Sequence, residues 1–175
     1  MAGAVAGEVT VRNTSMLSKQ ADTAICTALV RAGAAVINDE DSVTASHRPL
    51  RAFEFDATHC PDLFPALAAL AAAAQGESVI RGTSRLEHKE CNRADAIREE
   101  YAKAGIEVDI SEEDVMRIRG GKIRPARVSS HNDHRMAMSM AVAGLLCDGE
   151  MTIEGAECVA KSYPGFFEDL EKIRI

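Results

Sequence analysis

Short segments of the chain alternate between apolar and polar residues, as β-strands with one solvated face do. Residues 8–12 and 115–119 follow this pattern, with charged or hydroxyl side chains at every second position. Two longer segments, 61–75 and 132–147, are instead apolar almost all round after their first turn. A helix with no polar face is buried on all sides. The pattern therefore predicts an α/β fold of inverted arrangement, with buried helices and sheets outside.

The chain also repeats itself. A Gly-Glu pair stands at residues 7–8, 76–77 and 149–150, and each pair runs into an alternating strand. A lysine and a helix follow each strand, and the first two copies continue with three extended segments and an apolar helix. The period is roughly 70 residues, too long for a common solenoid repeat. The sequence therefore predicts a domain built from copies of one αβ unit.

The repeat carries a further expectation for the start of the chain. Each Gly-Glu pair should follow a buried apolar helix, yet only Met-Ala-Gly-Ala-Val-Ala precedes Gly7. Those six residues have the composition of the end of such a helix. We therefore expect residues 1–175 to form a single partial domain that begins inside a structural unit, whereas natural boundaries more often lie in polar linkers.

Composition and charge narrow the function classes. The net charge of −7 disfavours nonspecific binding to nucleic acid or to an anionic membrane surface. No apolar run reaches the ~20 residues of a membrane-spanning helix, and the N-terminus lacks a basic signal-peptide region. The five cysteines form no CxxC pair, so neither a disulfide framework nor a zinc site is indicated. We expect a cytoplasmic protein with reduced thiols and no metal.

The segment Lys-Glu-Cys-Asn-Arg, residues 89–93, is a first candidate for chemistry. Lys89 and Arg93 would share one face of a helix, where like charges cost ~0.2–0.5 kcal/mol. An anion bound between them would remove that cost. A solvated basic turn explains the same residues without function. Glu90 is either an ion-pair partner of the two cations or a general acid.

Two helix starts are further candidates. Asn132 or Asp133 can cap the second apolar helix, and Arg135 then adds a bidentate donor to an anion-binding N-terminus. Asp62 occupies the corresponding position before the first apolar helix. Ordinary helix capping accounts for both motifs without any function. If the two helices pack together, their N-termini converge at one end.

Convergence would bring a mainly cationic set of side chains into one pocket, suited to a small phosphorylated or carboxylated ligand. The set consists of Asp62, Lys89, Glu90, Arg93, His134, Arg135 and Lys161. Lys161 also has a simpler interpretation, in which its stem lies over the C-terminal helix and its amine reaches solvent.

The motifs together resemble a known family. Pro-Asp at 61–62, the Lys-Glu and Arg of 89–93, Asn-Asp-His-Arg-Met-Ala-Met at 132–138 and the segment 156–170 are similar to the C-terminal domain of EPSP synthases. The resemblance implies an inside-out αβ barrel. It implies transfer of the enolpyruvyl group of phosphoenolpyruvate to the 5-hydroxyl of shikimate 3-phosphate, in aromatic amino acid biosynthesis. It also implies that the reaction uses no metal or cofactor.

The resemblance assigns roles to individual residues. Asp62 corresponds to a proton acceptor that also contacts the shikimate ring, and Glu90 to a proton donor. Arg93, Arg135 and Lys161 correspond to a clamp on phosphoenolpyruvate, where glyphosate also binds. Lys89 corresponds to a shikimate 3-phosphate ligand and His134 to a supporting residue. Substrate contacts are implied for Asp62, Lys89, Arg93, His134, Arg135 and Lys161.

Some features depart from the family pattern. Many members have Ser-Asp or Thr-Asp where this chain has Cys91 and Asn92. Loss of that aspartate predicts a looser orientation of Arg93. The family's N-terminal domain, which holds the shikimate phosphate, has no motif in this chain. The fragment is therefore expected to be inactive alone.

Two other interpretations stay open at this point. The chain could resemble instead the related UDP-N-acetylglucosamine enolpyruvyl transferases, which share the fold but use a different acceptor. It could also be a non-catalytic anion-binding module, with a partner copy covering its exposed end.

Overall fold

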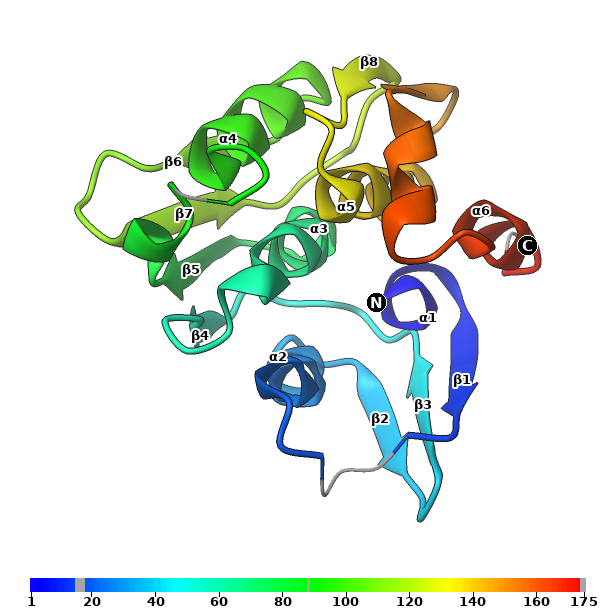
Figure 1. Ribbon diagram of the computed structural model, residues 1–175. Coiled ribbons are helices and arrows are strands. Elements are labelled where there is room, and N and C mark those ends of the chain that lie inside the picture. Colours follow the sequence, from blue (N-terminus) through cyan, green and yellow to red (C-terminus); the bar gives the residue numbers. More distant parts are fainter. Residues whose placement is uncertain (15–17, 88, 174–175) are drawn as a thin grey trace.

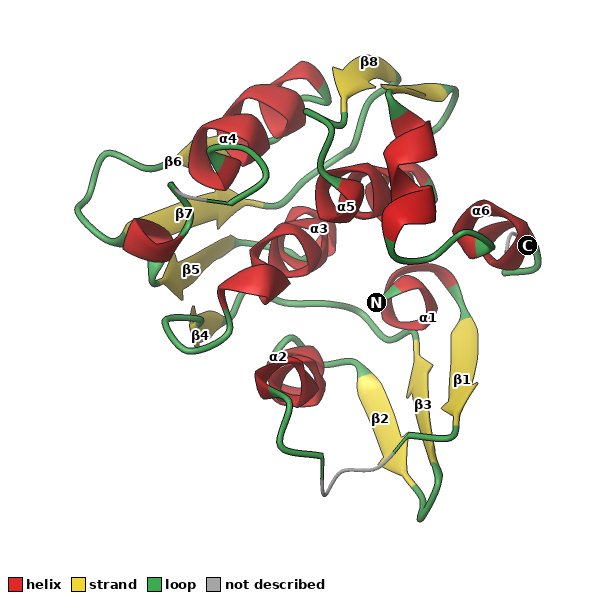
Figure 2. Ribbon diagram, in the orientation of Figure 1, coloured by secondary structure: helices red, strands yellow, loops and turns green. Residues whose placement is uncertain are grey.

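The computed structural model describes residues 1–14, 18–87 and 89–173 (Figure 1). The helices within them are α1 (Ala2–Ala6), α2 (Ile25–Arg31), α3 (Phe64–Ala73), α4 (Arg93–Lys103), α5 (His134–Gly144) and α6 (Phe166–Glu171). The strands, shown in yellow in Figure 2, are β1 (Glu8–Arg12), β2 (Ala35–Asn38), β3 (Ser42–Ser46), β4 (Glu54–Asp56), β5 (Glu77–Arg81), β6 (Glu107–Asp109), β7 (Val115–Arg119), β8 (Ala126–Ser129) and β9 (Met151–Glu154). Short 3₁₀-helical segments are η1 (Ala21–Ala24), η2 (Pro61–Leu63), η3 (Thr83–Arg85) and η4 (Ala156–Lys161).

The predicted repeat is confirmed by the sheet topology. One sheet has the order β1-β3-β2, a second β4-β5-β7-β6, and a third β8-β9. In each unit the last strand leaves its own sheet and pairs in parallel with the first strand of the next unit, β4 with β5 and β8 with β9. The units therefore interlock through shared sheets.

Two apolar helices occupy the interior, as the sequence predicts. Figure 1 shows α3 and α5 next to each other at the centre, with the sheets around them. Phe64, Leu67 and Leu70 on α3 are fully buried, as are Met136 and Met140 on α5. Helix α3 has no polar residue beyond its first turn, and the one in α5, Ser139, is buried and donates to Pro65 O of α3. Both helices are therefore buried along most of their surface.

Helix boundaries differ slightly from those expected. The first apolar helix starts as the 3₁₀ turn η2, with Pro61 at its first position, and becomes α-helical only at Phe64. The second begins at His134 rather than Asn132, because Asp133 is its N-cap and accepts a hydrogen bond from Arg135 N. Such shifts of one or two residues are usual at helix ends.

The short helix α1 occupies the same place before β1 that α3 has before β5 and α5 before β9. Ala4 and Val5 are buried, and α1 packs on β1, β3 and α5. Gly3 allows this close packing, since a Cβ there would meet Ala45 O and would lie 2.7 Å from Val9 N. A short, largely buried apolar helix thus stands before Gly7, as the repeat predicts.

Within the described ranges, no helix has the length and apolar character that crossing a lipid bilayer would require.

Candidate functional site

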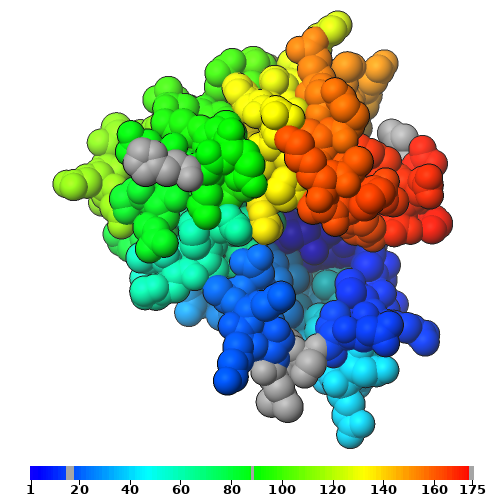
Figure 3. Space-filling view, viewed as in Figure 1, coloured from blue at the N-terminus to red at the C-terminus, as the bar shows by residue number. Residues whose placement is uncertain are grey.

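Three helices begin close together at one end of the molecule. η2 leads into α3, Asn92 caps α4 and Asp133 caps α5. On the face seen in Figure 3, the teal surface near residue 60, the green surface before α4 and the yellow surface before α5 adjoin. Each N-terminus carries free N–H groups and partial positive charge. The predicted convergence of helix starts is confirmed, and α4 joins the two helices that the sequence indicated.

Arg93 is the central side chain of this region and is fully buried. Its Nε donates to Asp133 Oδ2 at 2.7 Å, Nη1 to Asp62 Oδ1 at 2.7 Å and Nη2 to Glu90 Oε2 at 2.7 Å. Asp133 is also fully buried. Burial alone would raise the pKa of Asp133, but the hydrogen bond and charge of Arg93, together with the hydrogen bond from Arg135 N, outweigh it and hold that pKa below its usual range. The guanidinium thus ties together three elements distant in sequence.

The prediction that Lys89 and Arg93 share a helix face is wrong. Helix α4 begins at Arg93, because Asn92 takes an extended conformation and its side chain accepts a hydrogen bond from Asp95 N. Lys89 lies in the preceding loop. Asn92 serves as the cap of α4, and three carboxylates bond the guanidinium of Arg93. The looser orientation of Arg93 stays a prediction.

The carboxylate of Asp62 lies among three cations. Lys89 Nζ is 3.1 Å from its Oδ1, Arg93 Nη1 is 2.7 Å from the same oxygen, and Arg135 Nη2 is 3.3 Å from Oδ2. Burial opposes ionisation, but the bonds from Arg93 and Lys89 dominate and lower the pKa of Asp62 to about 2. Asp62 is therefore an ionised, weak base, and it occupies the position that an anionic ligand would compete for.

A hollow adjoins this carboxylate. It has a volume of about 200 Å³ and is lined by Asp62 and Arg135 together with apolar side chains of α3 and α5. Asp22, from η1, approaches the far side of Arg135, with its Oδ2 3.8 Å from Nη1. The sequence analysis missed Asp22, whose only signal is an acidic side chain in the first turn of a helix. Arg135 thus pairs with both Asp22 and Asp62 and also lines the hollow.

Glu90 and His134 stand on the outer side of Arg93. Glu90 is exposed, and its Oε1 is 4.0 Å from His134 Nδ1. Within the described part of the chain, that ring nitrogen is buried and has no hydrogen-bond partner. Glu90, Asp133 and His134 have the side-chain types and spacing of a metal site. Arg93 already bonds both carboxylates, however, so a cation of the protein itself balances their charge.

Lys161, at the end of η4, reaches the turn before α5. Its Nζ donates to Asn132 O at 3.0 Å and to Asn132 Oδ1 at 2.8 Å. The alternative in which the amine only extends over the C-terminal helix is therefore wrong. The structure brings the seven side chains singled out from the sequence to one end of the domain, but their chemical roles stay predictions.

Cys91 offers a test of this geometry. Its Sγ lies 3.8 Å from Asp133 Oδ2, and burial, followed by the charge of Asp133, raises the pKa of the thiol to about 11. Because the thiolate is the nucleophile, Cys91 should react with iodoacetamide much more slowly at pH 8 than free cysteine does. Mass spectrometry of a variant that keeps only Cys91 would measure the rate. Alkylation at the rate of free cysteine would contradict the contact with Asp133.

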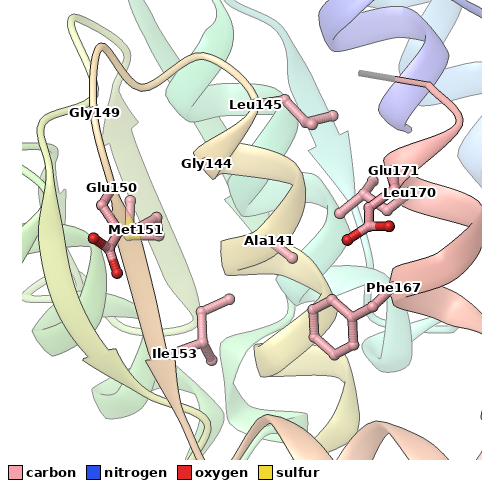
Figure 4. Close-up of a pocket in the computed structure, with 10 residues that line it drawn as sticks. All are labelled: Ala141, Gly144, Leu145, Gly149, Glu150, Met151, Ile153, Phe167, Leu170 and Glu171. Atoms are coloured by element: carbon pink, nitrogen blue, oxygen red, sulfur yellow. The ribbon is translucent and has the colours of Figure 1, made fainter.

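A second hollow lies elsewhere and has a different character. Figure 4 shows it between α5, β9 and α6, with a volume of about 260 Å³. Its lining is Ala141, Gly144, Leu145, Gly149, Glu150, Met151, Ile153, Phe167, Leu170 and Glu171. The only charged side chains there, Glu150 and Glu171, are acidic and would repel an anion. This hollow is therefore poorly suited to an anionic ligand, in contrast to the cationic end where α3, α4 and α5 begin.

The fold and this cluster define an αβ protein whose repeated units bury apolar helices and gather cations at the helix starts, as a binder of small anions would. Comparison with known proteins then gives the family. Residues 1–170 match the family model EPSP synthase (3-phosphoshikimate 1-carboxyvinyltransferase). The chain belongs to this family.

Individual relatives agree. A 3-phosphoshikimate 1-carboxyvinyltransferase of Methanocella arvoryzae is 43% identical over 98% of this chain and 41% of its own length. The protein of the same description from Thermococcus kodakarensis is 42% identical, over 98% of this chain and 43% of its own length. A solved EPSP synthase from Acinetobacter baumannii superposes with a TM-score of 0.82, at 27% identity, over 99% of this chain and 43% of that one. The chain thus spans about two-fifths of the relatives' length. The structural match confirms the expected α/β fold class.

Proposed function

We propose that this chain carries the phosphoenolpyruvate-binding part of the active site of a 3-phosphoshikimate 1-carboxyvinyltransferase. The observation that supports the proposal most directly is the gathering of Lys89, Arg93 and Arg135 around the single carboxylate of Asp62. Lys161 adds a fourth cation at the edge of the group. Phosphoenolpyruvate carries a phosphate and a carboxylate, which guanidinium and ammonium groups recognise through charge-assisted hydrogen bonds.

Asp62 and Glu90 are the proposed proton-transfer groups. Addition of the shikimate 5-hydroxyl to phosphoenolpyruvate requires a base for the hydroxyl proton and an acid for the methylene carbon; elimination of phosphate then restores the double bond. A bound anion would draw the cations away from Asp62 and so raise its proton affinity above that of the free state. Glu90 is the more exposed carboxyl group and keeps one oxygen, Oε1, free of Arg93.

The other half of the catalytic site would lie outside this chain. We propose that residues 1–175 form most of a C-terminal domain and that an N-terminal domain of the same protein holds the phosphate of shikimate 3-phosphate. The share of the relatives' length that this chain spans supports that division. A cytoplasmic location fits the five cysteines, which are all free thiols.

Titration calorimetry tests the proposal. The isolated chain should bind phosphoenolpyruvate weakly, and Arg135→Gln should reduce the affinity about tenfold or more, since a charged hydrogen bond contributes roughly 1.5–3 kcal/mol. Arg98→Gln is the matched control, because Arg98 is an exposed arginine on α4 whose ion-pair partner among the described residues is Asp95. Equal affinities in both variants would contradict the anion site.

Turnover assays, together with the binding measurements, separate the alternative functions. Turnover by the isolated chain would contradict the split site, whereas turnover that returns on mixing with the N-terminal domain would support it. With both domains present, a preference for a UDP-sugar over shikimate 3-phosphate as acceptor would overturn the proposed substrate. Failure to recover any turnover with either acceptor, together with retained anion binding, would favour a non-catalytic module.

A further inference from the structure

The turn that leads into α5 has an unusual backbone. His131 and Asn132 have φ of 51° and 57°, and Asp133 N donates to Ser130 O at 2.9 Å. Two successive residues with positive φ inside such a hydrogen bond form the arrangement of a type I′ turn. Glycine favours these conformations, and asparagine tolerates them. Histidine at the first central position is less favourable, so something else must hold it there.

The turn matters because it carries an acceptor for a proposed ligand-binding cation. Both oxygens of Asn132, backbone O and side-chain Oδ1, accept from Lys161 Nζ. Their direction depends on φ of His131 and Asn132. If the turn relaxed to negative φ, the carbonyl of Asn132 would point elsewhere and Lys161 would lose its fixed position. Asp133, in contrast, is held independently by Arg93.

Glu100 contacts the turn from a neighbouring helix, in addition to the Ser129 and Ser130 hydroxyls, which accept from His131 N and Asn132 N within the turn. It lies on α4 and is fully buried. It accepts from Ser129 N at 2.9 Å and from His131 Nε2 at 2.6 Å, while Lys103 Nζ is 2.9 Å from both of its oxygens. Its carboxylate therefore bonds both the backbone just before the turn and the imidazole ring of His131. Burial raises the pKa of Glu100, but the hydrogen bonds from Lys103, Ser129 and His131 together lower it below its usual value.

We propose that Glu100, acting through the imidazole of His131, is a positioning residue that keeps the 130–133 turn in its left-handed form and so places Lys161 for the anionic ligand. The inference rests on the proposed function, because it concerns the same site. Neither Glu100 nor His131 is expected to touch the substrate.

Substitutions at residue 131 separate positioning from general stability. In His131→Ala the ring bond is lost and alanine disfavours positive φ, so phosphoenolpyruvate affinity should fall about tenfold. In His131→Gly the ring bond is equally lost, but glycine keeps the turn, so most of the affinity should return. Glu100→Gln should resemble His131→Ala, and Asp148→Asn, on an exposed side chain that pairs with Lys122, is the control. Equal losses in the alanine and glycine variants would overturn the proposal.

A double-substitution cycle tests the route through Lys161. In a Lys161→Ala background, the difference in affinity between His131→Ala and His131→Gly should vanish, since the group being positioned is gone. A difference that persisted would show that the turn acts on another group and would overturn the assignment.

A measurement without ligand distinguishes failure of this inference from failure of the proposed function. In the nuclear magnetic resonance spectrum, Lys161→Ala should shift the side-chain amide signal of Asn132 in the unmodified chain and in His131→Gly, but not in His131→Ala. That pattern supports the positioning role even if the chain does not bind phosphoenolpyruvate. An equal shift in all three backgrounds would overturn the role, whatever the ligand data show.

Discussion

Replacing Arg93 with methionine should lower the free energy of unfolding by about 3–5 kcal/mol, the usual effect of removing one partner from a buried ion pair. Methionine preserves apolar volume but leaves Asp133 fully buried with no cation to neutralise it. Asp62 and Glu90 lose a partner too, although both are partly exposed and can recruit water. Urea unfolding followed by circular dichroism would measure the difference.

Two controls make this prediction specific. Arg98→Met removes an exposed arginine of the same helix, and its ion pair with Asp95 should contribute only about 0–1 kcal/mol. The double variant Arg93→Met with Asp133→Asn should be more stable than Arg93→Met alone, because the unpaired buried charge is gone. A loss for Arg93→Met no larger than that for Arg98→Met would show that Arg93 is not the electrostatic centre of this end of the domain.

Replacing Asp62 with asparagine should separate binding from chemistry. In the two-domain enzyme, kcat should fall about 10²–10⁴-fold, the contribution typical of a general base. Phosphoenolpyruvate binding should be unchanged or tighter, because asparagine no longer neutralises Lys89, Arg93 and Arg135. Steady-state kinetics combined with calorimetry would measure both quantities.

The comparison variant for this experiment is Asp148→Asn. Asp148 is exposed and pairs with Lys122, and neither residue belongs to the proposed site. Loss of the Asp148 carboxylate should therefore leave kcat and phosphoenolpyruvate affinity unchanged. If Asp62→Asn weakened phosphoenolpyruvate binding, the three cations would need Asp62 to hold their positions. If kcat matched that of Asp148→Asn, Asp62 would not be the proton acceptor.

Local patterns predicted the elements of this fold well. The segments expected to be strands, 8–12 and 115–119, coincide with β1 and β7. Their alternation follows from solvation of one sheet face, which each strand encodes by itself. The apolar segments became the buried α3 and α5 because a helix without a polar face has no side to turn toward solvent.

Prediction failed where a cap competed with periodicity. Lys89 and Arg93 have the spacing of one helix face, but Asn92 starts the helix between them by bonding Asp95 N. Spacing alone carries no information on which residue starts a helix. Because Lys89 lies in the loop before α4, its amine reaches Asp62 and forms an ion pair with it.

The sequence by itself determined the repeated unit, the helices that must be buried and the motifs that identify the family, because these depend on residues near one another in the chain. Only the tertiary structure decided which charges meet. Arg93 joins Asp62 and Asp133 across 31 and 40 residues, and Arg135 meets Asp62 across 73. Those pairings depend on how α3, α4 and α5 pack at their N-termini. A buried guanidinium is stable only where that packing places carboxylates around it.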